Sequence, residues 1–150
     1  MGKKRVVKKT EKEILSEREK VDKSFRKEIS ISPTQKFRGG RVYISSTYNN
    51  TIITLTNESG DVLASRSAGA IGFKGTKKGT SYAASKVAQA VALICEKLRI
   101  KKISIFIKGV GGGRNTALKS LVSQGLEIES IQDITPIPHN GCRPKKPRRV

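Results

Sequence analysis

The sequence predicts one α/β domain built on a mixed β-sheet, with strands and helices in the order β-β-β-α-β-α-β. Short runs rich in β-branched residues alternate with turn residues over 41–67, and two later segments repeat apolar residues at helical spacing. Because strand-helix-strand connections are right-handed, the last two strands should be parallel and the helices should pack on the sheet. A chain of 150 residues, 35% of them hydrophobic, is long enough for one compact core.

Residues 1–40 form a charge-dense extension before this domain, with 13 basic and 6 acidic residues. Apolar residues at spacings of seven and four would allow a short amphipathic helix over 11–28, but a helix of this length is marginal by itself. We expect a basic tail that is disordered when free and orders on a partner. Gly39 and Gly40 mark the start of the globular domain, which we place at 41–135.

The first three strands should form an antiparallel meander over 41–67. Turn residues at 48–50 separate the first two runs, and residues 57–61 separate the second run from the third. The next stretch, 68–80, is rich in glycine and lysine, so we expect a loop there.

The first helix is expected over 81–98, with Thr80 or Ser81 as its N-cap. Cys95 lies beside its apolar face, and we interpret this cysteine as a small core residue rather than a reactive thiol. Apolar residues at spacings of four, four, three and four define the face, namely Ala83, Val87, Val91, Ile94 and Leu98.

A strand at 102–108, a helix at about 115–124 and a last strand at about 127–135 should follow. Gly125 stands at the left-handed position that ends many helices. Isoleucines spaced by three break the alternation of the last strand and predict a bulge. The predicted core face of the second helix comprises Ala117, Leu118, Leu121 and Val122.

The net charge indicates a polyanionic partner. With 31 Lys and Arg against 12 Asp and Glu, the formal charge is +19, and nucleic acid is the first candidate. No apolar run approaches the ~20 residues of a membrane-spanning helix. The first residues show neither a secretory signal nor the acid-poor composition of a transit peptide. Two cysteines in unlike contexts favour a reducing compartment.

A glycine cluster joins the strand at 102–108 to the second helix, in the sequence KGVGGGR. The dinucleotide fingerprint requires a third glycine where Arg114 stands, and no P-loop ending in Gly-Lys-Ser/Thr is present. Gly111, Gly112 and Gly113 would instead let backbone N–H groups approach a phosphate, with Lys108 and Arg114 adding charge. The alternative is a simple strand-to-helix turn.

Side chains for catalysis or metal binding are scarce. The single histidine, His139, has no obvious orienting carboxylate, and the acids of the strands are scattered. One His and Cys142 cannot complete a zinc site. We therefore expect no enzymatic activity, no metal, no cofactor and no small-molecule substrate.

The C-terminal segment, 136–150, carries five basic residues and no acid, and its prolines favour an extended path. It should be an extended basic tail that binds a polyanion, with nucleic acid as the first candidate. Asn140 precedes Gly141, whose backbone nitrogen is unshielded, so Asn140 is a candidate for isoaspartate formation through a succinimide.

Four stretches in one order carry a family resemblance: STYNNTI at 46–52, GFKGTKKGT at 72–80, KGVGGGR at 108–114 and DITPIPHNGCRPKKPRRV at 133–150. Over about residues 41–150 the chain resembles small-subunit ribosomal protein eleven of bacterial or organellar type. The resemblance implies a ribonuclease-H-like domain without catalysis, on the platform of the small ribosomal subunit. It further implies binding to small-subunit ribosomal RNA near the messenger exit path, beside ribosomal proteins seven and eighteen, in a bacterial cytoplasmic or an organellar ribosome.

Motif by motif, the resemblance also implies which residues face RNA. Gly79 stands where the family commonly has serine, and Val110 where it commonly has proline. The implied RNA-binding residues are Asn49, Asn50, Lys74, Lys77, Lys78, Lys108, Gly111, Gly112, Arg114, His139, Asn140, Arg143, Lys145, Lys146, Arg148 and Arg149.

A structural RNA-binding protein of the ribosome is the function that the sequence favours. A free-standing RNA or DNA chaperone would use the same charge, and a small nucleotide-dependent enzyme is the third alternative.

Overall fold

The computed structural model describes residues 39–143 together with Glu19, Phe37, Lys145 and Lys146. Apart from Glu19, the predicted helix over 11–28 lies outside these residues, as does nearly all of the predicted extension 1–40. Strand β1 begins at Gly39, within the glycine pair where the sequence places the start of the domain.

Five strands form one mixed sheet in the order β3-β2-β1-β4-β5. Antiparallel pairing joins β1 to β2 and β2 to β3, whereas β1 pairs with β4, and β4 with β5, in parallel. Both the predicted meander and the predicted parallel last pair are confirmed, and the class is the predicted α/β fold with a mixed sheet. The strands are β1 (Gly39–Ser46), β2 (Thr51–Thr56), β3 (Val62–Ser67), β4 (Lys102–Lys108) and β5 (Glu127–Asp133).

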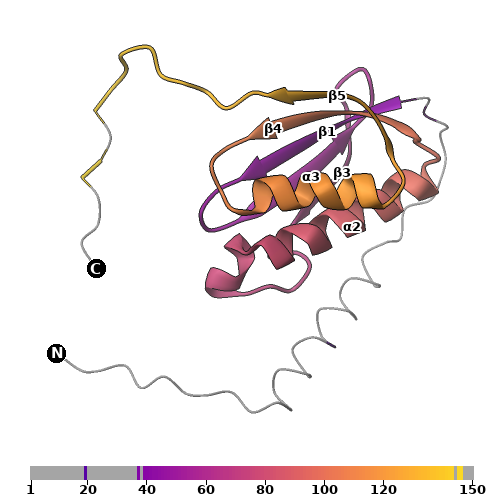
Figure 1. Ribbon diagram of the computed structural model, residues 1–150, viewed down its shortest axis with the longest axis horizontal. Helices are drawn as coiled ribbons and strands as arrows, with labels where there is room; N and C mark the ends of the chain where they lie inside the picture. Colours follow the sequence, from indigo (N-terminus) through magenta and orange to yellow (C-terminus); the bar gives the residue numbers. More distant parts are fainter. Residues whose placement is uncertain (1–18, 20–36, 38, 144, 147–150) are drawn as a thin grey trace.

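Two helices, α2 (Ser81–Lys97) and α3 (Gly113–Ser123), cover the same face of the sheet (Figure 1). The core lies between the two layers, where alternate strand residues such as Ile44, Ile53 and Ile105 are fully buried. The predicted face of the first helix is confirmed, since its five residues are at most 5% exposed. The predicted cap is also confirmed, because the Thr80 hydroxyl accepts a hydrogen bond from the Ala83 N–H at 3.3 Å.

Cys95 is fully buried in this core, as predicted. Burial raises the pKa of its thiol to about 12, so the group stays protonated and unreactive near neutral pH. The left-handed position predicted after the second helix is confirmed as well, because Gly125 has a φ of 79°. The predicted bulge is at Glu129, which is skipped where Ile103 pairs with Ile128 and Ser104 with Ser130.

Four expectations need correction. The stretch 68–80 is not all loop, because η1 (Gly75–Gly79) is a short 3₁₀ helix. The Thr80 hydroxyl and N–H both donate hydrogen bonds to the Lys77 carbonyl at the end of this helix. Helix α3 starts at Gly113, two residues before the predicted start, and this glycine is packed so closely on Thr51 and Ala84 that a Cβ has no room there. Strand β5 ends at Asp133, short of 135. Val122 is 53% exposed, because α3 packs mainly on α2 and β1 and leaves its outer flank in solvent.

Candidate nucleic-acid interface

The turn between β1 and β2 forms the centre of one end of the sheet, the left end in Figure 1. Thr47 and Asn50 build it: the Thr47 N–H and hydroxyl both donate to the Asn50 carbonyl, at 2.9 and 3.1 Å. The Asn50 side-chain oxygen accepts from the Thr51 N–H at 3.0 Å. The hydrogen-bonding groups of Asn50 are thus partly used within the turn, whereas the neighbouring Asn49 is exposed.

The lysine-rich loop packs against this turn through Gly79. A Cβ at Gly79 would lie 2.2 Å from the Tyr48 carbonyl oxygen, so the two backbones are in direct contact. This contact places η1 beside the β1–β2 turn. Lys74 and Lys77 are exposed there, and Lys78 is half-buried.

The glycine cluster approaches the same turn from the other side. The Gly111 N–H donates to the Ser46 carbonyl at 3.0 Å, and a Cβ at Gly111 would lie 2.3 Å from the Thr47 carbonyl oxygen. Gly111 is therefore buried in the domain, although the sequence suggests that it contacts phosphate. Gly112 differs, because it is exposed and has open space around it.

The positive end of helix α3 faces solvent beside Gly112. No side chain caps this helix, and no acidic residue lies in its first turn. Gly112 and Lys108, which ends β4, are both exposed near this helix end, whereas Gly113 is buried and the Arg114 N–H donates to the Gly111 carbonyl at 3.2 Å.

Arg114 has a structural role that the sequence does not predict. One nitrogen of its guanidinium donates to the Gly109 carbonyl at 3.1 Å, and another forms a short ion pair with the Asp133 carboxylate. Arg114 thus joins the glycine cluster to the end of β5, and part of its charge is neutralised.

Thr135 completes this connection. Its N–H and hydroxyl donate to the Asp133 carboxylate at 2.9 and 2.6 Å, and its oxygen accepts from the Gly109 N–H at 3.0 Å. The hydrogen bond from the Thr135 hydroxyl, followed by those from Arg114 and the Thr135 N–H, lowers the pKa of the Asp133 carboxyl to about 2. We call Gly109, Arg114, Asp133 and Thr135 the tail clamp, because it holds the residues from which the C-terminal tail leaves.

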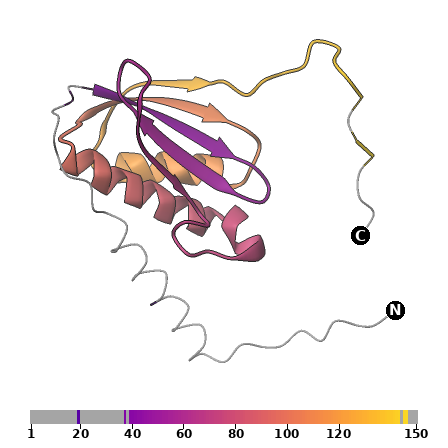
Figure 2. The same ribbon diagram turned by 180° about the vertical axis from the view of Figure 1, so that it is seen from behind.

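The tail leaves the domain at the same end as the turn and the two loops, and extends away from it (Figures 1 and 2). In its described part, no residue from 134 to 143 belongs to a helix or strand, as the prolines predict. His139, Asn140, Arg143, Lys145 and Lys146 are all exposed. Arg148 and Arg149 lie outside the described residues.

Two functional features escape the sequence analysis. Tyr48 is 79% exposed in the β1–β2 turn, where its ring could stack on a nucleic-acid base. The tail clamp has a local signal, an aspartate two residues before a threonine at the end of a strand, which is typical of side-chain turns. Its link to Arg114, 19 positions away, has no such signal.

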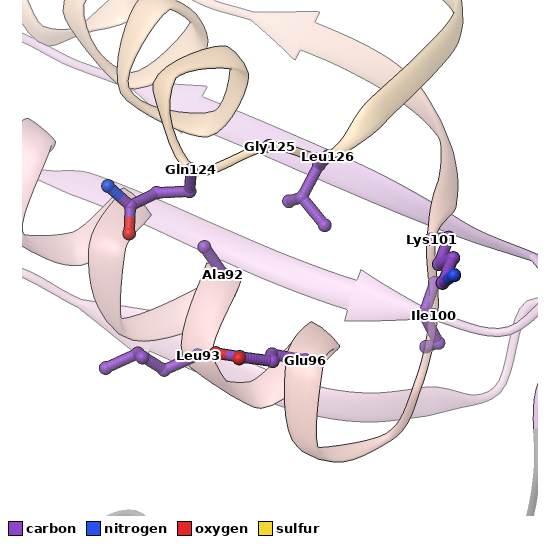
Figure 3. Close-up of a pocket in the computed structure, with 8 residues that line it drawn as sticks. All are labelled: Ala92, Leu93, Glu96, Ile100, Lys101, Gln124, Gly125 and Leu126. Carbon is purple, nitrogen blue, oxygen red and sulfur yellow. The ribbon is translucent and has the colours of Figure 1, made fainter.

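A cavity of about 210 Å³ lies between the C-terminal ends of α2 and α3, away from the glycine cluster (Figure 3). Its charged lining residues are Glu96 and Lys101, and small-molecule sites are usually larger, ~300 Å³ or more. Among the described residues no three His, Cys, Asp or Glu side chains gather as metal ligands would, and no helix could cross a bilayer.

Comparison with known proteins decides the family. The sequence model of Ribosomal protein S11 matches residues 40–149. The chain belongs to the ribosomal protein S11 family. The S11 family is structural and not enzymatic, so the chain is a structural protein of the small ribosomal subunit, as the sequence predicts.

Relatives within the S11 family share about half of the residues. The uS11 proteins of Endomicrobium trichonymphae and Thermotoga maritima are each 52% identical, over 81% and 83% of this chain and 95% and 98% of their own. The uS11c protein of Trieres chinensis is 52% identical over 74% of this chain and 85% of its own. These relatives agree with the predicted location in a bacterial or an organellar ribosome.

Proposed function

We propose that this S11 protein binds small-subunit ribosomal RNA on the platform, near the messenger exit path, and supports subunit assembly and translation. One observation carries the proposal: three motifs that are far apart in the sequence converge on the end of the sheet from which the basic tail leaves. A convergent cationic surface with a basic arm suits a folded polyanion.

Each part of the surface has its own role in this proposal. Lys74, Lys77, Lys78 and Lys108 neutralise phosphates, and the backbone at Gly112 donates to a phosphate at the positive end of α3. Asn49 and Asn50 contact RNA at the turn, and Arg114 holds the tail clamp while its remaining donors face the RNA. The domain 41–135 acts as the rigid body, and the tail 136–150 reaches between RNA helices. The extension 1–40 orders on a partner.

Neighbouring ribosomal proteins complete the environment. We place the protein beside ribosomal proteins seven and eighteen, as its family resemblance implies. Its large positive charge then serves the RNA, and not a membrane or a small-molecule substrate.

A salt titration tests the RNA-binding proposal. The dissociation constant for a transcript of the platform RNA should rise steeply with salt, with a log–log slope of several units, because phosphate contacts release counterions. An affinity that does not change with salt would contradict the proposal. Rate-zonal sedimentation of a cell extract separates it from the chaperone alternative, since a ribosomal protein should sediment almost wholly with small subunits.

A further inference from the structure

Strand β5 lies at the edge of the sheet, and only its start is covered, where Ile128 is partly buried against the core. Helix α3 packs mainly on α2 and β1. Ile131 of β5 pairs with Ile105 of β4, which is completely buried, yet Ile131 itself is 53% exposed. The face of the sheet that forms the core therefore continues into solvent at β5.

Exposed apolar residues continue from β5 into the start of the tail. Ile134 and Ile137 follow Ile131 at spacings of three and are 42% and 80% exposed. The Ile134 N–H donates to the Ile107 carbonyl of β4 at 2.9 Å, so the segment still runs along the sheet at this point. A single exposed isoleucine needs no explanation, but three on one edge segment indicate an interaction site.

The charge of this edge is opposite to that of the rest of the chain. No Lys or Arg stands between Lys119 and Arg143, a stretch that contains Glu127 and Glu129 besides Asp133, whose carboxylate is already paired with Arg114. Lys102 lies 3.8 Å from Glu129, but both side chains are more than half exposed, so this ion pair is weak. In a protein of charge +19, an acidic and apolar edge repels phosphate and attracts a cationic polypeptide.

The backbone of β5 offers a way to bind such a polypeptide. Its outer edge pairs with no strand among the described residues. An extended peptide can add to such an edge through main-chain hydrogen bonds, with its side chains on the exposed isoleucines. A second copy of β5 would fit poorly, because its acids would face the same acids. We infer that the β5 edge, Glu127–Ile137, docks an extended basic segment of a neighbouring protein. This inference does not rest on the proposed RNA contacts.

Site-specific photocrosslinking tests the inference in assembled small subunits. The full chain carries p-benzoylphenylalanine in place of Ile131, and irradiation should join it to a Lys- and Arg-rich peptide of another protein, identified by mass spectrometry after ribonuclease treatment. The same probe in place of Val110, which is 64% exposed in the glycine cluster, is the matched control and should crosslink to RNA. Crosslinks from position 131 to RNA or to this chain itself, or none at all, would overturn the inference. A failure at position 110 alone would instead count against the proposed RNA surface.

A charge variant sharpens the test. Glu127→Gln with Glu129→Gln should lower the crosslink yield from position 131 severalfold, because the attraction to the basic segment is weakened. Glu58→Gln, at an exposed acid in the turn after β2, is the control and should leave the yield unchanged. An unchanged yield in the double variant would overturn the proposed charge complementarity.

Discussion

The glycine cluster and the C-terminal tail both look like phosphate-binding segments in the sequence, but the structure places them in different environments. Gly111 is buried against the β1–β2 turn, and Arg114 is held by Asp133. After Thr135, in contrast, every described residue from Pro136 onward is exposed. Glycine and arginine residues thus contribute to packing in the domain, whereas the basic residues of the tail remain available to a ligand. Changes at Gly111 or Arg114 should therefore lower stability, and changes in the tail should lower binding.

Deletion of residues 136–150 should have the largest effect on assembly. The truncated protein keeps Thr135 and the tail clamp, so we expect a melting temperature within a few degrees of the full chain. Incorporation into small subunits should fall by tenfold or more, because five basic residues are lost. Thermal melting and quantitative mass spectrometry of purified subunits measure the two effects. Normal incorporation of the truncated protein would remove the contrast between domain and tail.

Two adjacent glycines give the sharpest test within the domain. Gly111→Ala should destabilise the fold by about 2 kcal/mol or more, because the new Cβ would lie 2.3 Å from the Thr47 carbonyl oxygen. Gly112→Ala should change stability by less than about 1 kcal/mol, since its surroundings are open. Chemical denaturation of both variants measures the difference. Equal losses would mean that the close approach at Gly111 does not contribute to stability.

The lysine-rich loop should behave more like the tail than like the buried part of the glycine cluster. Replacing Lys77 and Lys78 by Ala should weaken RNA binding and reduce the salt slope by about one unit for each lost phosphate contact. The melting temperature should change little, because Lys77 is exposed and Lys78 only half-buried. If melting falls sharply and binding does not, the loop belongs with the packed cluster.

The tail clamp should respond to acid. Because the pKa of Asp133 is lowered to about 2, its ionised form stabilises the fold fully above about pH 4, and the stabilisation is lost as the pH falls towards 2. Asp133→Asn removes this contribution at every pH. The difference in melting temperature between the wild type and the variant should therefore be constant from pH 5 to 7 and shrink below pH 4. A constant difference down to pH 2 would argue against the clamp.

Asn140 should give the smallest effect, a slow chemical change in the tail. We expect isoaspartate to form there, because Asn140 is exposed and Gly141 follows it. Peptide mapping of aged subunits with an isoaspartate-specific methyltransferase measures it. An unmodified Asn140 would indicate that bound RNA holds this segment as rigidly as the domain holds Gly111.

The sequence predicts those features that depend on local periodicity and turn chemistry. The buried face of α2, the Thr80 cap and the left-handed Gly125 all follow from residues within a few positions of one another. The prediction that Val122 is buried is wrong. Helical spacing identifies the apolar face of a helix, but it does not show how much of that face the neighbouring elements cover. The difference between Gly111 and Gly112 could not be predicted, because it depends on a turn more than 60 residues earlier in the chain.

The parallel pairing of β1 with β4 also determines when the domain can form during synthesis. Gly39 pairs with Lys102, roughly 60 residues later, whereas the first three strands are joined by short turns. Closing such a long loop costs entropy before its contacts form. The meander of β1, β2 and β3 should therefore fold first and remain without β4 until that strand has been synthesised. The cationic end of the sheet is complete only when the glycine cluster has left the ribosome that makes it. A nascent chain that stops before Lys102, where β4 begins, therefore exposes the open edge of β1, and this is the stage at which it is most prone to aggregate.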